Sequence, residues 1–376
     1  MSMDRVLAGN DPVGRAGAPV IPSARTKFTA GLLIICTAAL LLLTSDAGSR
    51  WRPQLPLPGP RRAATDQPAG QHGIARMVVW RQLIKTTGAN RTTASRLVVY
   101  NRVDKCGSTT MNRLLTRLSS WKRRFSKQSS TQYWKRYLSQ QGQANFVELL
   151  TRMAAEKPLI YDRHVSYIDF TRFNRSQPIY VNLIRDPVER FISLFYFLRM
   201  PRRRRGRGHT ADLGWLHKNL TACVRGNDPE CSISSQYRHP GPFGDEFFQP
   251  MTSFFCGHEP LCREFNDRKA LQKALQNLET NYAVVGILES FSQSLHVFEK
   301  YVPYFFQNIV KITRRAVRKQ NRNDGRPWTS PAVKAVLAGR LWADVELYSF
   351  ASQRLYLQYR RIGGSLQAAR PEQRWQ

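Results

Sequence analysis

A lysine, a glycine and three hydroxyl side chains lie between an apolar run at residues 97–100 and helical apolar spacing at residues 111–118. A strand, loop and helix N-terminus of this kind bind anions, because backbone N–H groups and the helix dipole face one spot. The loop residues expected to contact the anion are Lys105, Cys106, Gly107, Ser108, Thr109 and Thr110. The pattern predicts a site for a phosphorylated cofactor. The alternative is an ordinary strand-turn-helix in which Ser108 caps the helix.

A second strand-to-helix junction lies further along the chain. Apolar residues 178–184 predict a strand, and residues 188–198 have the spacing of a helix. Arg185 follows the strand, and Ser193 lies inside the helix. We expect this guanidinium and hydroxyl to bind a second phosphate, since a guanidinium grips phosphate in bidentate fashion. The alternative is a plain corner in which the arginine pairs with a neighbouring carboxylate, that of Asp186 or Glu189.

Five segments together resemble the uronic-acid 2-O-sulfotransferases of glycosaminoglycan synthesis: residues 101–108, 163–173, 185–193, 254–257 and 285–289. The resemblance extends from about residue 95 to residue 355, with the segments in family order. It implies a sulfotransferase fold with a P-loop-like strand-loop-helix that binds the donor PAPS (3′-phosphoadenylyl sulfate). The uronyl branch looks closer than the heparan branch. Heparan enzymes carry two histidines two residues apart, where this chain has Asp162 and His164.

The resemblance assigns roles to the two junctions. The loop around Lys105 is expected to bind the 5′-phosphosulfate, with the lysine stabilising charge on the departing phosphate oxygen. Arg185 and Ser193 are expected to bind the 3′-phosphate. His164 is expected to be the base, because an imidazole can accept a proton from a sugar hydroxyl near neutral pH. Without the resemblance, His164 is interpreted as structural or exposed, and Lys105 as a solvated loop residue.

The balance of charges predicts a polyanionic partner. Lys and Arg number 58 against 26 Asp and Glu, which gives a formal net charge of +32. The arginines expected to contact a sulfated, carboxylated sugar chain are Arg102, Arg163, Arg203 and Arg204. The alternative for the last two is a solvated loop. Arg318, in a later basic span, matches a family cofactor contact, and no metal is expected.

An apolar run near the N-terminus argues against nucleic acid as that partner. Residues 28–44 are uncharged and largely apolar, which is the lower limit for a helix that spans a bilayer. A signal peptide cleaved near Ala47 is the alternative. The expected organisation is a cytosolic tail (1–27), a signal anchor (28–44), a luminal stem (45–76), a catalytic domain (77–365) and a C-terminal tail (366–376). The resemblance implies a single-pass type II protein of the Golgi membrane and a possible homo-oligomer.

Cysteines and glycosylation triplets agree with a secretory lumen. Two local pairs stand apart from the loop cysteine, and the resemblance implies that both form disulfides: Cys223 with Cys231, and Cys256 with Cys262. Free thiols remain the alternative. Three triplets predict N-glycans at Asn90, Asn174 and Asn219.

The remaining pattern predicts an α/β fold, a parallel sheet flanked by helices, because apolar strands alternate with periodic helices. We expect residues 119–145 to be helical and one C-terminal helix to contain the apolar residues between 333 and 348. The resulting hypothesis is a PAPS-dependent 2-O-sulfotransferase for uronic acid, with dermatan or chondroitin sulfate favoured over heparan sulfate as acceptor. The alternatives are a sulfotransferase for glycoprotein glycans, a glycosaminoglycan-binding protein without turnover, and a secretory kinase.

Overall fold

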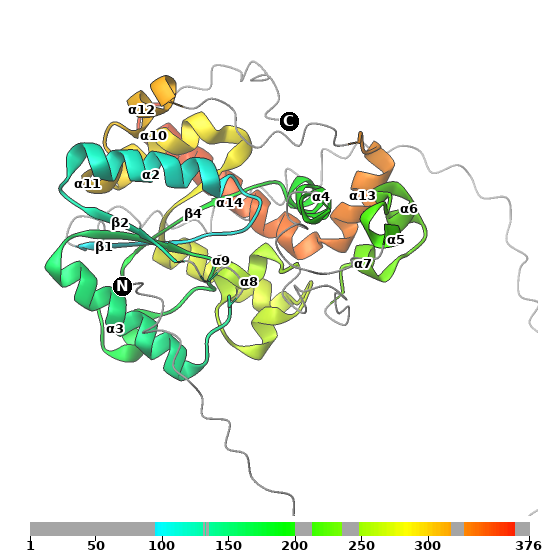
Figure 1. The fold of residues 1–376 in the computed structure, drawn as a ribbon, viewed down its shortest axis with the longest axis horizontal. Helices are drawn as coiled ribbons and strands as arrows, with labels where there is room; N and C mark the ends of the chain where they lie inside the picture. Colours follow the sequence, from blue (N-terminus) through cyan, green and yellow to red (C-terminus); the bar gives the residue numbers. More distant parts are fainter. Residues whose placement is uncertain are drawn as a thin grey trace, which may run out of the picture. The chain divides into compact units, whose positions relative to one another are not determined.

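The computed structural model describes residues 95–130, 132, 135–199, 213–234, 248–316 and 327–364. Five strands form one parallel sheet in the order β2-β3-β1-β4-β5 (Figure 1). The strands are β1 (Leu97–Asn101), β2 (Ser126–Ser129), β3 (Leu159–Arg163), β4 (Ile179–Ile184) and β5 (Tyr282–Ile287). This arrangement confirms the predicted α/β fold class.

The central strands are buried along their whole length. All residues of β1, β3, β4 and β5 are buried, as expected for parallel strands covered by helices on both faces. Val99 of β1 is paired with Tyr161 of β3 on one side and with Tyr180 of β4 on the other. β1, the first strand that the structure describes, is therefore the middle strand of the sheet.

Helices cover the sheet on both sides. In Figure 1, α2, α10, α11 and α12 gather on one side of the sheet and α3 lies on the other. The helices of this core are α2 (Ser108–Lys122), α3 (Gln140–Glu156), α8 (Met251–Cys256), α9 (Arg268–Asn281), α10 (Phe291–Tyr301), α11 (Pro303–Phe306), α12 (Ile309–Ala316) and α14 (Trp342–Arg361). The described residues also contain three 3₁₀ turns: η3 (Phe170–Phe173) between β3 and β4, η6 (Pro260–Arg263) between α8 and α9, and η7 (Leu288–Ser290) between β5 and α10.

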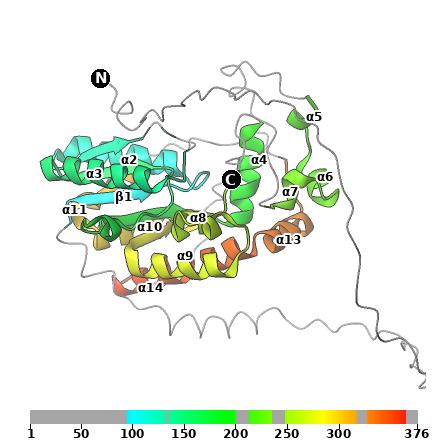
Figure 2. The same ribbon diagram turned by 90° about the horizontal axis from the view of Figure 1, so that it is seen from below.

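A second, smaller apolar cluster forms around α4 (Pro187–Leu198) beside the main core. Asp186 begins this helix, because its side chain accepts a hydrogen bond from the Glu189 N–H at 2.9 Å and Pro187 follows. One side of α4 packs with short helices, which Figure 2 shows on the side of α4 away from the sheet. They are α5 (Leu213–Leu216), α6 (Leu220–Arg225), α7 (Pro229–Ser232) and α13 (Pro331–Arg340).

Two expectations about secondary structure are wrong. Residues 119–145 are not one helix, because α2 ends at Lys122 and the strand β2 follows. The β2 sequence, Ser-Lys-Gln-Ser, has no apolar alternation, because β2 is an edge strand that pairs only with β3. The C-terminal helix is divided at Leu341, so that α13 packs in the α4 cluster while α14 packs in the main core.

Both expected disulfides are present. Cys223–Cys231 joins α6 to α7, and Cys256–Cys262 joins the end of α8 to η6. Within the described part of the chain, no helix is long and apolar enough to cross a bilayer. The expected anchor at residues 28–44 lies outside the described residues.

The glycosylation triplets fall on the surface where the structure describes them. Asn174 and Asn219 are exposed, and Asn219 caps α6 through Oδ1, which accepts from the Ala222 N–H at 3.1 Å. Attachment of a glycan at Nδ2 leaves that oxygen in place. Asn90 lies outside the described residues.

Candidate active site

Four strand ends bring the candidate residues to one edge of the sheet. Because all strands are parallel, their carboxyl ends lie together, and ligands bind there in open α/β sheets. His164 follows β3, the Lys105 loop follows β1, Arg185 follows β4 and Glu289 follows β5. These strands are adjacent in that order. The two predicted phosphate sites and the predicted base are therefore neighbours.

Gly107 allows the donor loop to enter α2. Its φ of 77° is left-handed, and it is the N-cap residue without a side-chain hydrogen bond. A Cβ atom at this position would lie 2.7 Å from Leu288 Cδ1. Ser108 is the first helical residue, so the interpretation of Ser108 as the cap is wrong. No acidic side chain lies in the first turn of α2, which leaves the positive end of the helix dipole uncompensated there.

Lys105 has an unusual backbone conformation. Its φ of 60° is left-handed, which costs a residue with a Cβ about 1–2 kcal/mol. Its Nζ lies 3.4 Å from the ring centroid of Phe197, near the end of α4. This cation–π contact holds the ammonium group against the C-terminal part of α4. Phe197 was not singled out from the sequence.

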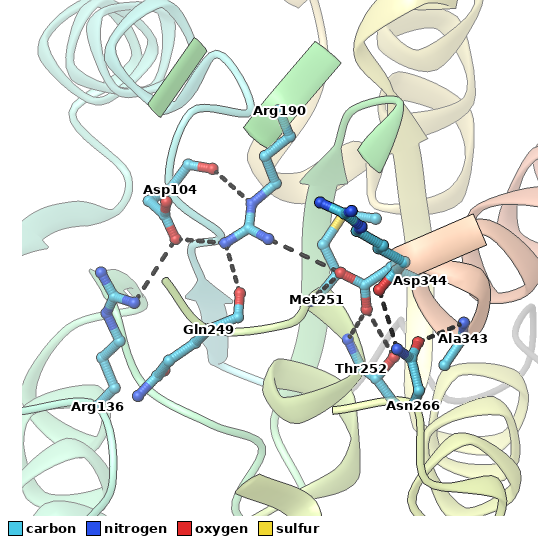
Figure 3. A network of polar contacts seen from close by, with 10 residues as sticks. Asp104, Arg136, Arg190, Gln249, Met251, Thr252, Asn266, Ala343 and Asp344 are labelled. Carbon is cyan, nitrogen blue, oxygen red and sulfur yellow. Dashed lines mark hydrogen bonds and ion pairs between the residues drawn. The ribbon is translucent and has the colours of Figure 1, made fainter. Parts of the chain in front are cut away.

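A buried arginine binds the residue before Lys105. Arg190 in α4 donates from Nε to the Asp104 carbonyl oxygen at 3.1 Å and from Nη2 to Asp104 Oδ1 at 2.8 Å (Figure 3). Burial raises the pKa of Asp104, but Arg190 and Arg136 outweigh it and hold that pKa below its usual range. These two charge-assisted hydrogen bonds hold the residue that precedes Lys105 in place.

The sequence did contain a signal for Arg190. Arg190 is followed by Phe191 and Ile192 on a mostly apolar helix, which predicts that its side chain is buried. A buried guanidinium needs a carboxylate partner. The identity of that carboxylate, 86 residues earlier, is not visible in any local pattern.

His164 is held by the donor loop. Its Nδ1 lies 2.9 Å from the Arg102 carbonyl oxygen, which can only accept, so Nδ1 carries the proton and the Nε2 atom carries the lone pair. Burial first, and then the positive charges of Arg102 and Arg136, lower the pKa of His164 to about 3, against smaller opposing effects of Asp104 and of the hydrogen bond to the Arg102 backbone. The ring is therefore neutral at neutral pH, in the tautomer that a base requires.

Asp162 is the centre of a polar network beneath this site. Its buried carboxylate pairs with Arg102 Nε at 2.9 Å and Lys127 Nζ at 2.6 Å. It also accepts hydrogen bonds from Ser129 Oγ at 2.7 Å and from Asn112 Nδ2 at 3.0 Å. Asp162 thus fixes Arg102, whose carbonyl oxygen holds His164.

The second junction places Arg185 between two carboxylates. Arg185 Nη2 lies 3.5 Å from Glu189 Oε2, and Nε lies 3.9 Å from Glu289 Oε1. The pair with Glu189 is the one that the alternative interpretation expected, yet both distances exceed those of tight charged hydrogen bonds. Ser193 is buried in α4. Binding of a 3′-phosphate by Arg185 and Ser193 stays a prediction.

The expected acceptor arginines differ in their surroundings. Arg163 is 2% exposed, and its Nη2 donates to Gln132 Oε1 at 2.8 Å and to the Lys135 carbonyl oxygen at 3.1 Å. Arg102 pairs with Asp162, as described above. Both arginines therefore hold the chain around His164, and their contact with substrate stays a prediction. The other expected basic contacts, Arg203, Arg204 and Arg318, lie outside the described residues.

Cys106 is a packed loop residue. The thiol is fully buried, and burial raises its pKa to about 12, so it is unreactive at neutral pH. Among the described residues no cluster of His, Cys, Asp or Glu could hold a metal ion.

Comparison with protein families identifies the family to which this fold and its candidate site belong. The model of the sulfotransferase family matches residues 91–351, which contain every junction described above. The chain belongs to the sulfotransferase family.

Individual sulfotransferases agree with this assignment. The chain is 37% identical over 278 residues to "Uronyl 2-sulfotransferase homolog pip" of Drosophila melanogaster, covering 70% of this chain and 52% of the relative. It is 31% identical over 283 residues to "Uronyl 2-sulfotransferase" of Homo sapiens, covering 73% and 66%. Identity to "Heparan sulfate 2-O-sulfotransferase 1" of Gallus gallus is 29% over 267 residues, covering 68% and 69%.

These identities confirm the expected family and its nearer branch. The chain spans about half the length of the Drosophila relative and just under two thirds of the human uronyl relative.

The state of His164 in this sulfotransferase can be measured by NMR. Because its pKa is about 3, the ring should stay neutral when the pH falls from 7.5 to 5. Adenosine 3′,5′-bisphosphate should raise that pKa, since nearby negative charge favours the imidazolium ion. The ring signal is assigned with the His164→Gln variant. Titration near pH 6.5 in the free protein would contradict the buried neutral ring.

Proposed function

We propose that this domain transfers the sulfuryl group of PAPS to the 2-hydroxyl of uronic acid residues in glycosaminoglycans. The observation that carries the proposal is the position of His164, a neutral Nδ1–H tautomer at the end of β3. It lies beside the Lys105 loop, which follows the neighbouring strand β1. Family membership and the uronyl relatives support the same reaction class.

The residues of the chain have complementary tasks in this transfer. PAPS supplies the sulfuryl group on a 5′-phosphate that leaves with its bonding electrons. His164 Nε2 accepts the proton of the attacking sugar hydroxyl, so that the oxygen forms its bond to sulfur as the bond from sulfur to the phosphate oxygen breaks. Lys105 and the N-terminus of α2 stabilise the negative charge on that phosphate oxygen. Arg185 and Ser193 bind the 3′-phosphate and orient the donor.

The acceptor in this proposal is dermatan or chondroitin sulfate rather than heparan sulfate. Higher identity to the uronyl relatives than to the heparan sulfate relative supports this choice. The net charge of +32 is suited to a long polyanion.

The proposed location is the Golgi membrane, in a single-pass type II orientation with the anchor at residues 28–44 and the domain in the lumen. The two disulfides and the exposed Asn174 and Asn219 support an oxidising secretory compartment. Self-association, which the family resemblance implies, belongs to the same proposal.

The reaction is tested with sulfur-labelled PAPS and desulfated dermatan, chondroitin and heparan chains, followed by disaccharide analysis. We expect label on the 2-position of uronic acid, most of it in dermatan or chondroitin. Binding of these chains without transfer would indicate a glycosaminoglycan-binding protein. Thermal stabilisation by ATP but not by adenosine 3′,5′-bisphosphate would indicate a kinase. Label on glycoprotein glycans alone would change the acceptor class.

His164→Ala should lower kcat by about 10²–10⁴-fold, the usual contribution of a general base. Affinity for adenosine 3′,5′-bisphosphate, measured by calorimetry, should stay close to that of the unsubstituted protein. His296→Ala is the control, because His296 is a half-buried histidine of α10 that is bonded within its own helix. Unchanged turnover in His164→Ala would remove this residue from the mechanism.

Arg185→Ala should weaken the binding of adenosine 3′,5′-bisphosphate by about 10- to 10²-fold, as the loss of a charged hydrogen bond predicts. Arg175→Ala is a matched control, since Arg175 pairs with Glu148 at 2.8 Å on the surface. A loss of kcat at normal affinity would contradict the assignment of Arg185 to the 3′-phosphate.

A further inference from the structure

Arg190 has the contacts of a residue that shapes the donor loop without touching the donor. It is fully buried in α4, and two of its nitrogens donate to one residue, Asp104. We propose that Arg190 and Asp104 form a clamp that holds Lys105 in the conformation needed for sulfuryl transfer, which makes Arg190 a positioning residue. This inference rests on the proposed function for its kinetic consequences and on the loop geometry for its structural ones.

The first step of the argument concerns the peptide bond before Lys105. The carbonyl oxygen of Asp104 and the backbone nitrogen of Lys105 belong to one planar unit. The bond from Arg190 Nε to that oxygen therefore fixes the plane from which the φ of Lys105 is set. The bond from Nη2 to Asp104 Oδ1 fixes the same residue by its side chain. Two donors on one rigid guanidinium thus restrain the backbone that leads into Lys105, the residue with the left-handed conformation.

The second step concerns the anchoring of the guanidinium itself. Nη2 also donates to the Gln249 carbonyl oxygen at 2.8 Å, and Nη1 lies 3.8 Å from Asp344 Oδ2 (Figure 3). Asp344, in α14, accepts from the N–H groups of Met251 and Thr252 at 2.7 and 2.9 Å. The clamp is therefore attached to the starts of both α8 and α14, which belong to the rigid core.

The third step concerns the side of the loop that faces His164. Asp104 Oδ1 lies 3.8 Å from Arg136 Nη1, and the Arg136 carbonyl oxygen accepts from the Ser166 N–H at 3.1 Å. Ser166 is two residues beyond His164. Asp104 thus lies between Arg190 of α4 and Arg136, whose backbone is bonded to the segment that follows His164. The Asp104 carboxylate therefore links the donor loop to the segment that contains the base.

A direct contact of Arg190 with a phosphate is incompatible with this geometry. The side chain has no exposed surface, and Nε and Nη2 already donate to Asp104 and Gln249. Arg190 therefore acts on the reaction through the groups that it holds, of which the donor loop is the one at the site.

The kinetic test is a double-mutant cycle between Arg190 and Lys105. Arg190→Lys should lower kcat by about 10²-fold, because a displacement of roughly 1 Å at the reacting groups has an effect of this size. Lysine cannot donate to both Asp104 atoms and to Gln249 with the fork of a guanidinium. In a Lys105→Ala background the same change should alter kcat by less than about twofold, because residues that act as one unit are not additive. Additive losses would overturn the clamp.

Arg354→Lys is the matched control. Arg354 is also a buried arginine, bound to Glu279 Oε2 at 3.1 Å and to the Tyr282 carbonyl oxygen at the start of β5, far along the strand from the donor edge. It should lose a similar amount of thermal stability while kcat stays near that of the unsubstituted protein. An equal loss of kcat in Arg354→Lys would show a general effect of core damage and would overturn the proposal.

Hydrogen exchange tests the clamp without sulfuryl transfer. Arg190→Lys should speed amide exchange in the peptide containing residues 102–108, whereas Arg354→Lys should not. If Arg190→Lys fails to fold, Asp104→Asn tests the same bond from its other end. Equal exchange in the clamp and control variants would overturn the inference. Absence of transfer by the unsubstituted protein, with selective exchange in the clamp variant, would instead remove only the proposed function.

Discussion

The parallel pairing of β1 with β3 and β4 is the constraint on which the site depends. Parallel strands present their carboxyl ends at one edge, so the residue that follows each strand is placed beside the residue that follows its neighbour. His164, the Lys105 loop and Arg185 are each short continuations of a buried strand. Hydrophobic burial of the sheet is not specific to any reaction. It nevertheless fixes the spacing of these three groups, on which the proposed reaction depends.

Buried ion pairs fix the conformation of the loops that follow the strands. Lys105 lies in a conformation that its side chain disfavours, and Asp104 is held on one side by Arg190 and approached on the other by Arg136. Asp162 has the same function below His164, where it pairs with Arg102 and Lys127. In a low-dielectric interior, charges that satisfy one another tolerate little displacement, so loops without regular structure acquire a defined geometry.

The sequence was sufficient for the parts that depend on local pattern. The strands β1 and β4, the helix α4 and the two junction loops were predicted, because apolar periodicity and the type of residue after each strand are local properties. The edge strand β2 and the break at Leu341 were not, since polar pairing at an edge and the division of one apolar face between two clusters depend on neighbours. Asp104, Arg136 and Phe197 escaped notice for the same reason. Their importance comes from partners distant in the chain.

The ion pair of Asp104 with Arg190 limits the transfer of the donor loop to other proteins. Residues 102–107 look like a self-contained motif, yet Asp104 pairs with a guanidinium of α4 that also donates to Gln249 before α8 and faces Asp344 of α14. A chimera that received this loop from a homologue without an acid three residues before its glycine would leave the buried Arg190 with Asp344, 3.8 Å away, as its nearest remaining carboxylate in α14. Engineers who wish to exchange donor specificity in this scaffold must therefore transplant the loop, position 190 and position 344 as a set.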